Sequence, residues 1–271
     1  MQNTEPQPAM KGLLIAQFFG AFNDNAWKMM VALLAIRGAT AGLSTSDPVF
    51  ESISQSRTTL AYVVFTLPLA LFSLPAGMVA DRISKSSLII WLKGAEIILM
   101  AAGTASLLIE GGTFYSLIVL GLMGIQAAFF SPAKYGIIPE ILPTEKLSWG
   151  NARLEMWTFL AIILGTGSGG LLLDLSGKTP AIAGCLLTMF SVAGWLASMY
   201  VPKVSAARSE GGFVQSISEA WKAIRADRVL FLSVLGSVYF WFTVSLLGQD
   251  ILVYSKALTR DWANSDTFSG I

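Results

Sequence analysis

Long apolar runs dominate this sequence, and they limit what the chain can fold into. An α-helix rises about 1.5 Å per residue, so about 20 apolar residues cross the hydrocarbon core of a bilayer. Runs of that length recur at residues 12–36, 58–80, 87–109, 114–137, 152–173, 180–201 and 229–254. We therefore expect an all-α membrane protein whose helices cross the bilayer seven times.

The composition agrees with this expectation and excludes several kinds of chemistry. Hydrophobic residues make up 54% and charged residues 13% of the 271 positions, against a usual charged share of about 25%. The single cysteine, Cys185, cannot form an internal disulfide, and the chain has no histidine. Ser/His and Cys/His catalytic arrangements and cysteine-based metal sites are thereby excluded. We predict no catalytic residue, no metal and no cofactor in this chain.

The connections between the runs predict how the helices are grouped. Residues 1–201 hold six helices with short connections, residues 202–228 form the longest connection, and residues 229–271 begin with a seventh helix. A lone seventh helix would leave the inner face of a six-helix bundle half covered. We therefore expect the first part of a protein of about twelve helices, built from three-helix inverted repeats.

The longest connection itself carries a helical pattern. Its apolar residues recur at steps of three and four, close to basic residues. The apolar positions are Phe213, Ile217, Trp221 and Ile224, and the basic ones are Lys222, Arg225 and Arg228. This pattern is typical of an interfacial helix on an anionic membrane surface. An ordinary soluble linker helix is the alternative.

The basic residues predict the orientation of the chain. Of the 18 Lys and Arg, twelve fall on the side of the N-terminus, five fall on the opposite side, and Lys28 lies within the membrane. Cytoplasmic loops are enriched in Lys and Arg, so we expect a cytoplasmic N-terminus. The first run lacks the basic leader and the cleavage site of a signal peptide, and we expect it to remain as a helix.

The first apolar run carries charges at its middle. Asp24 lies there between Asn23 and Asn25, and Lys28 follows one turn later. A charge at mid-bilayer costs about 2.5–3.5 kcal/mol on insertion scales. The four-residue spacing puts Asp24 and Lys28 on one face, where they can neutralise each other. We expect these four residues to meet a polar or charged substrate in a cavity; a pair that only locks the first helix against its neighbours is the alternative.

Other polar residues also lie inside the predicted spans. Gln17 and Gln126 are further candidates for the cavity. Lys93 and Glu96, three positions apart in the third run, are expected to pair with each other. Lys134 lies near the end of the fourth run, from which its ammonium can reach the membrane surface.

The turn between the second and third runs carries a motif. It reads Gly77-Met78-Val79-Ala80-Asp81-Arg82-Ile83-Ser84-Lys85. It resembles the G-x-x-x-D-R-x-G-R/K signature of the major facilitator superfamily at the same place in the topology, with Ser84 where the family has glycine. The resemblance implies the major facilitator fold: a six-helix N-terminal bundle plus the first helix of the second bundle. It also implies gating roles for Gly77 in close helix packing, Asp81 as a charge partner of the eleventh helix, and Arg82 and Lys85 at the cytoplasmic face.

Two further stretches narrow the resemblance. Phe22-Asn23-Asp24-Asn25-Ala26-Trp27-Lys28 and the stretch from Phe129 to Glu140 resemble the lysophospholipid transporter branch of the superfamily. Its members move lysophospholipids inward across the bacterial inner membrane. The resemblance implies a flippase of that membrane working by alternating access, with Asp24 and Lys28 contacting the charged headgroup. Lysophospholipid and membrane lipids would be its partners, together with an acyltransferase and acyl-acyl-carrier-protein synthetase, fused or separate; no nucleic acid is implied.

The end of the fourth run offers candidates for gating. Pro132 interrupts the helical hydrogen bonds there and favours a kink. Beyond it, we expect cytoplasmic ion pairs among Glu140, Arg153 and Glu155 that hold one state of the transport cycle.

Two other functions stay open. A proton-coupled drug or siderophore exporter of the same superfamily would use Asp24 as its proton carrier, although the neighbouring Lys28 favours the ionised carboxylate. The chain could instead be the membrane part of a fused lysophospholipid acyltransferase, which a His-x-x-x-x-Asp motif beyond residue 271 would support.

Overall fold

The computed structural model describes residues 7–44, 47–177, 179–206, 213–240 and 242–243. The chain divides into two units, residues 1–209 and residues 210–271. All the regular structure in the described residues is helical, and they contain no strand. The prediction of an all-α protein is confirmed.

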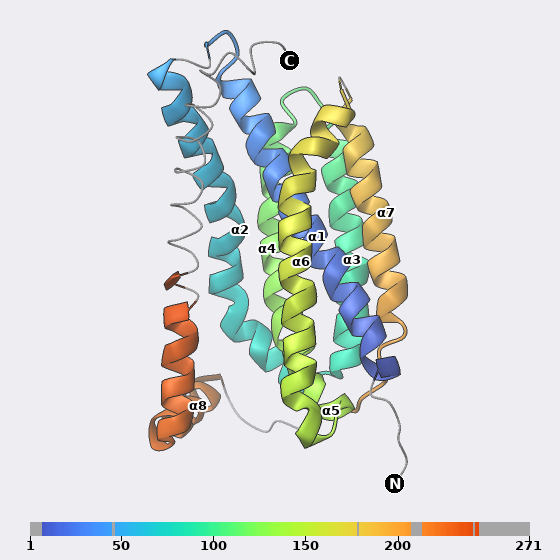
Figure 1. Cartoon of the computed structure of the whole chain (residues 1–271), viewed down its shortest axis with the longest axis vertical. Helices are drawn as coiled ribbons and strands as arrows, with labels where there is room; N and C mark the ends of the chain where they lie inside the picture. Colours follow the sequence, from blue (N-terminus) through green and yellow to red (C-terminus); the bar gives the residue numbers. More distant parts are fainter. Residues whose placement is uncertain (1–6, 45–46, 178, 207–212, 241, 244–271) are drawn as a thin grey trace, which may run out of the picture. The chain divides into compact units, whose positions relative to one another are not determined.

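The first unit is a bundle of long helices that run alternately up and down (Figure 1). They are α1 (Gln7–Ala39), α2 (Pro48–Arg82), α3 (Lys85–Ser106), α4 (Thr113–Gly136), α6 (Leu147–Leu175) and α7 (Ala181–Ser198). Two short helices, α5 (Ile138–Ile141) and the 3₁₀ helix η1 (Thr144–Lys146), connect α4 to α6. The end of the bundle where α1 begins also holds the ends of α2 and α4, and we call it the N-terminal end.

Five helices of the bundle are long and apolar enough to cross a membrane. They are α2, α3, α4 extended by α5, α6 extended by η1, and α7. These five predicted spans are confirmed. Helix α1 has the length but is not among the five, because polar residues interrupt its middle.

Helix α2 begins earlier than the sequence suggested, at Pro48 instead of residue 58. The Asp47 side chain accepts a hydrogen bond of 2.8 Å from the backbone N–H of Val49, and Pro48 occupies the first turn. Both are typical of a helix N-terminus. The polar residues that follow therefore extend the helix instead of forming a loop.

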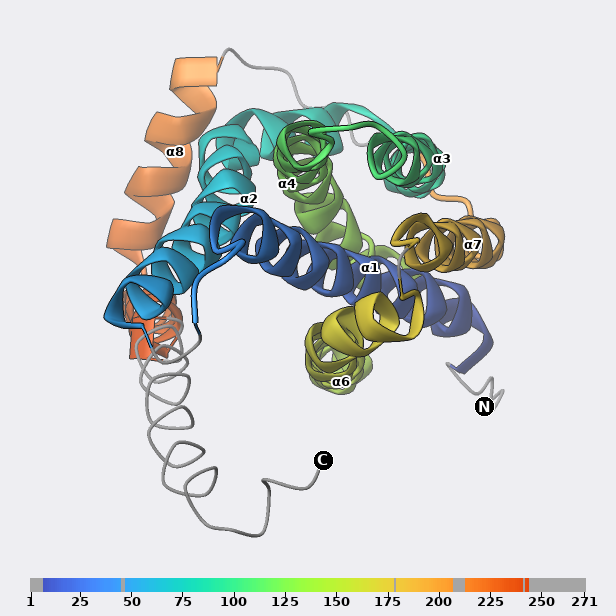
Figure 2. The same ribbon diagram turned by 90° about the horizontal axis from the view of Figure 1, so that it is seen from above.

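Helix α1 is the centre of the bundle and passes between α4 and α6 (Figure 2). It also packs against α2 and α7. Two glycines of α6 allow the closest of these approaches: a Cβ added at Gly165 would lie 2.5 Å from the backbone oxygen of Phe22, and one at Gly169 would lie 2.7 Å from that of Ala26. Small residues at such positions let helix backbones meet in membranes. Other helices of the bundle thus surround much of α1.

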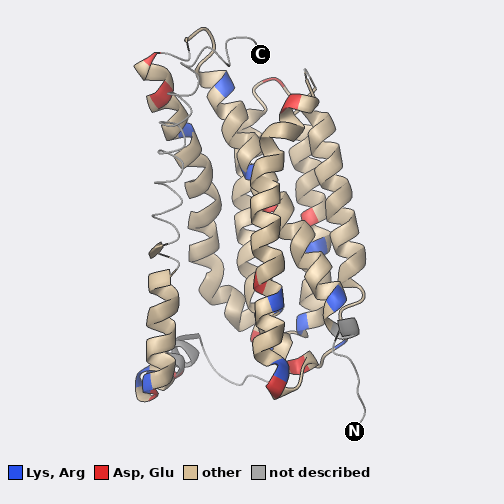
Figure 3. Cartoon of the chain, viewed as in Figure 1, with Lys and Arg blue, Asp and Glu red and all other residues tan. Residues whose placement is uncertain are grey.

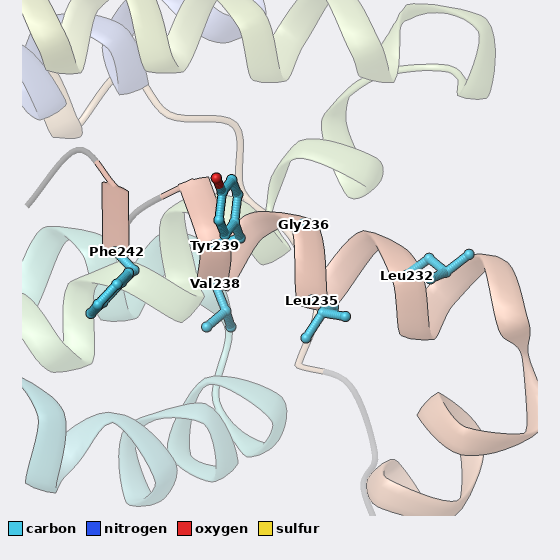
Figure 4. A pocket seen from close by; sticks show the side chains of 6 residues that line it. All are labelled: Leu232, Leu235, Gly236, Val238, Tyr239 and Phe242. Carbon is cyan, nitrogen blue, oxygen red and sulfur yellow. The ribbon is translucent and has the colours of Figure 1, made fainter.

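The second unit contains α8 (Phe213–Ala226) and the apolar helix Arg228–Phe240. Helix α8 confirms the helical pattern read in the long connection, whereas its place at the membrane surface stays a prediction. Apolar side chains of the second helix line a recess of about 560 Å³ (Figure 4). The predicted seventh span, residues 229–254, extends beyond the described residues. Gly236 and Tyr239 are among the described residues that line this recess, and none of these carries a charge.

Candidate functional site

Polar side chains form a layer inside the first unit, between two apolar clusters. One cluster lies toward the N-terminal end and includes Met10, Leu88 and Leu154. The other includes Trp27 and Met100, farther along the same helices. The residues between them on α1, α3 and α4 are polar or charged: Gln17, Asp24, Lys93, Glu96, Gln126 and Lys134. Most other charges gather at the two ends of the bundle (Figure 3), so this layer is a distinct internal feature.

A buried ion pair stands at one side of this layer. Lys93 Nζ donates a hydrogen bond of 2.7 Å to Glu96 Oε2, and the two side chains are only 1% and 3% exposed. Lys93 Nζ also lies 4.7 Å from the centre of the Phe130 ring. The predicted pairing of these two residues on α3 is confirmed. Since both charges are buried, removing either one would leave the other uncompensated.

Asn23 supports this pair from α1. Its side-chain nitrogen lies 3.3 Å from Glu96 Oε1, 3.1 Å from the backbone oxygen of Leu187 and 3.0 Å from Ser191 Oγ. Its own side-chain oxygen has no hydrogen-bond partner among the described residues. Asn23 therefore joins α1, α3 and α7 and is not among the residues that line the cavity; its contact with a substrate stays a prediction.

The layer encloses a small cavity of about 60 Å³. One water needs about 10–15 Å³ of such volume, so the cavity accommodates a small polar group but not a whole lipid. Gln17 and Gln126 line it as predicted. The side-chain nitrogen of Gln17 donates a hydrogen bond of 2.8 Å to Thr158 Oγ1, and that of Gln126 donates one of 3.1 Å to the backbone oxygen of Leu92. The side-chain oxygens of both glutamines therefore remain able to accept hydrogen bonds.

Asp24 and Lys134 are the other two charged groups that line the cavity. In the part of the chain that the structure describes, neither makes an ion pair, and Asp24 makes no side-chain hydrogen bond. Lys134 Nζ lies 4.9 Å from the centre of the Tyr135 ring. The cavity thus presents one carboxylate and one ammonium, the complement of a group that carries both a cation and an anion.

Gly20 makes this arrangement possible. A Cβ at this position would lie 2.1 Å from Lys93 Nζ and 3.4 Å from Glu96 Oε2. Any other residue would push the lysine from its partner. The absence of a side chain at Gly20 therefore gives the Lys93 ammonium access to the cavity wall.

Two of the predicted substrate residues lie away from the cavity. Lys28 makes no ion pair with Asp24; its Nζ lies 4.7 Å from the ring centres of both Tyr62 and Phe65 on α2. The side-chain nitrogen of Asn25 donates a hydrogen bond of 2.7 Å to the backbone oxygen of Ala21, on the same helix. The ammonium groups that line the cavity are instead those of Lys93 and Lys134, and the sequence had suggested the membrane surface for Lys134. The sequence features that could have located the cavity are the charged pair Lys93 and Glu96 on α3 and the position of Lys134, two residues after Pro132.

The expected ion pairs at the N-terminal end are formed by different partners. Glu140 pairs with Lys85 at 2.6 Å, not with Arg153. Lys85 is 7% exposed, so it lies inside the bundle instead of at a free surface. The Arg153 guanidinium lies 5.4 Å from the Trp149 ring, and Glu155 accepts a hydrogen bond from the Tyr135 hydroxyl. Glutamate 140 sits on α5, a helix that the sequence pattern missed.

For the other gating candidates, the structure gives no contact in the described ranges that bears on a gating role. Asp81 and Arg82 are exposed at the end of α2, and a Cβ at Gly77 would meet nothing within 4 Å among the described residues. Pro132 lies within α4, which continues to Gly136. Their gating roles stay predictions. No group of three or more potential metal ligands occurs in the described part of the chain.

The fold and this site define a class: a multi-pass helical membrane protein with a charged internal cavity. Comparison with known proteins gives the family. The Major Facilitator Superfamily matches residues 13–270, and the chain belongs to this superfamily of transporters. The predicted major facilitator fold is thereby confirmed.

Named relatives show which members of the superfamily the chain is similar to. The chain is 32% identical over 237 residues to the lysophospholipid transporter LplT of Escherichia fergusonii. It is 30% identical over the same length to proteins of that name from Escherichia coli and Shigella dysenteriae. Each match covers 86% of this chain but 54% of the relative. The chain therefore spans about half the length of these transporters, and the resemblance read from the two sequence stretches agrees with their names.

Proposed function

We propose that this chain supplies the headgroup site of a lysophospholipid transporter in the bacterial inner membrane. The transporter moves its substrate inward by alternating access, with the N-terminal end of the bundle in the cytoplasm. The observation that carries this proposal is the cavity that Asp24 and Lys134 both line, neither of them in an ion pair with another described residue.

The chemistry of the headgroup matches this cavity. A glycerophosphate ester carries a phosphate, and the ethanolamine form adds an ammonium. Lys134 binds the phosphate, and Asp24 accepts hydrogen bonds from the ammonium or from headgroup hydroxyls. Charge-assisted contacts of this kind are stronger in a low-dielectric interior than in water. The acyl chain lies outside the cavity, whose volume of about 60 Å³ takes only the polar tip.

Uptake of labelled lysophosphatidylethanolamine into spheroplasts that express the full-length protein tests the proposal. The parent is compared with Asp24→Asn, Lys134→Gln and the control Arg37→Gln, each at parental membrane levels. Arg37 belongs to an exposed ion pair with Asp174 at the far end of α1, so its loss costs little. We expect uptake by the parent and the control, and none by the two cavity variants. Parental uptake by both cavity variants would contradict the assignment of the site.

A proton-coupled exporter of the same superfamily is the second candidate. One observation favours it: Lys28 Nζ lies against the rings of Tyr62 and Phe65 and forms no ion pair with Asp24, and a cavity carboxylate outside an ion pair can carry a proton. Transport that follows an imposed pH gradient, and that loses this dependence in Asp24→Asn, would select the exporter. Uptake that is the same with and without the gradient would select the lysophospholipid transporter.

A further inference from the structure

Lys28 lies in the interior of the bundle and forms no ion pair with another described residue. Its side chain is 8% exposed, and its Nζ stands 4.7 Å from the ring centres of Tyr62 and Phe65. No carboxylate of the described residues lies at ion-pair distance from it. Asp24, one turn earlier on α1, lines the cavity instead.

The two rings hold the ammonium without cancelling its charge. An aromatic face attracts a cation through its quadrupole, and the attraction strengthens when water is excluded. Such a cradle fixes the position of the cation, but its full positive charge stays available to an anion. This distinguishes Lys28 from Lys93, whose charge Glu96 already neutralises at 2.7 Å.

Lys28 stands outside the ion pairs inside the bundle. Lys93 pairs with Glu96, and Lys85 pairs with Glu140. Asp24, the carboxylate of α1, lines the cavity together with Lys134. An anionic group beside Lys28 would therefore meet an ammonium that no ion pair of the described residues occupies.

We propose that Lys28, held between Tyr62 and Phe65, is a second anion-binding site that receives the phosphate of the lipid one helical turn away from the cavity. The inference rests on the proposed function, since the lipid supplies the phosphate. Helix α1 carries Lys28 toward its C-terminal end and Asp24 toward the cavity, so a headgroup passing along α1 meets the ammonium first when it comes from the end opposite the N-terminal end. The Tyr62 hydroxyl, which has no hydrogen-bond partner in the described part of the chain, provides a donor beside the same anion.

Binding to the purified full-length transporter tests this site. The probes are lysophosphatidylglycerol and a monoacylglycerol with the same acyl chain, which lacks the phosphate. The variants are Lys28→Met, Lys28→Arg and Tyr62→Phe, with Arg37→Gln as a matched cation removed from the same helix. Lys28→Met should bind lysophosphatidylglycerol about tenfold or more weakly, because a charge-assisted contact is lost. Its affinity for monoacylglycerol should not change. Lys28→Arg should keep most of the preference for lysophosphatidylglycerol over monoacylglycerol.

The stability of the lipid-free protein gives an independent readout. An ammonium without a counterion costs free energy in a buried site, so Lys28→Met should melt at the parental temperature or above it. A melting temperature several degrees lower would show that the protein already compensates the charge of Lys28, and would overturn the proposal. Should that variant not fold, Tyr62→Phe decides: a threefold to tenfold weaker affinity for lysophosphatidylglycerol alone supports the site, and parental affinity overturns it.

The remaining outcomes separate this site from its alternatives. Equal affinities of Lys28→Met and the parent for lysophosphatidylglycerol would overturn the proposal while leaving the proposed function intact. Displacement of that lipid from the parent, but not from Lys28→Met, by millimolar inorganic phosphate supports an anion site within the lipid site. Phosphate binding at Lys28 with unchanged lipid binding would assign it to a free anion and overturn the lipid assignment. A parent that binds neither lipid would contradict the proposed function itself.

Discussion

Replacement of the buried Lys93–Glu96 pair tests whether the polar layer is built for stability or for its charge. The pair is 1% and 3% exposed, with 2.7 Å between Nζ and Oε2. Lys93→Met leaves Glu96 charged and buried, with Asn23 as its remaining donor at 3.3 Å. Breaking a buried pair in this way costs about 3–5 kcal/mol. In a bundle of this size the melting temperature should fall by roughly 6–20 °C.

The structure predicts an asymmetry between the two single variants. Glu96→Met frees Lys93, but that ammonium lies 4.7 Å from the Phe130 ring and shares the cavity with Asp24, which can receive it. Asn23 keeps its contacts with Leu187 and Ser191. We therefore expect Glu96→Met to cost about half as much as Lys93→Met, or less. The double variant, with two apolar side chains of similar volume, should melt within a few degrees of the parent.

Thermal unfolding of the purified full-length protein in detergent, followed by tryptophan fluorescence, measures all three variants. A double variant that loses the sum of the two single losses would refute the reasoning, because it would show that each side chain contributes by packing and not through the other's charge. Uptake should be measured on the double variant as well. If it folds like the parent but does not transport, the pair is retained for the cavity.

Two further predictions concern contacts around the site. Gly169→Ala should lower the free energy of unfolding by about 1–3 kcal/mol, because its Cβ would lie 2.7 Å from the backbone oxygen of Ala26. The matched control is Gly167→Ala, whose Cβ meets nothing within 4 Å among the described residues. Equal melting temperatures of the two variants would contradict the close packing of α1 on α6. Glu140→Gln should cost about 1–3 kcal/mol, because it leaves the buried Lys85 without its carboxylate. Glu145→Gln, exposed on the neighbouring η1, should melt like the parent, and a Glu140→Gln variant that does the same would show that the ion pair contributes nothing.

Much of the fold could be predicted from hydropathy alone. Five spans were placed by their apolar runs, because helices that face lipid must be apolar along most of their length. The start of α2 was missed because its first residues are polar and carry no apolar periodicity, whereas the Asp47 cap and Pro48 that begin it are local features. Helix α5, four residues long, is too short for any periodic pattern.

The site was predicted only in part, for a geometric reason. Sequence spacing places residues on one helix relative to each other, so Lys93 and Glu96 on α3 were paired correctly. The same rule paired Asp24 with Lys28, yet the neighbours of α1 decide where each side chain points. Tyr62 and Phe65 of α2 attract Lys28, while the cavity at Gly20 receives Asp24. Contacts between helices far apart in sequence, such as Lys85 with Glu140, have no signal in a single chain.

The polar middle of α1 also bears on how the protein is made. Helix α1 leaves the ribosome before α6 and α7, which cover it and follow more than one hundred residues later. Each of Asp24 and Lys28 adds about 2.5–3.5 kcal/mol to the cost of entering lipid unaided. Helix α1 therefore reaches its stable place only as its later neighbours arrive. For this bundle, we therefore expect membrane insertion of α1 and its packing against α6 and α7 to be coupled during biosynthesis.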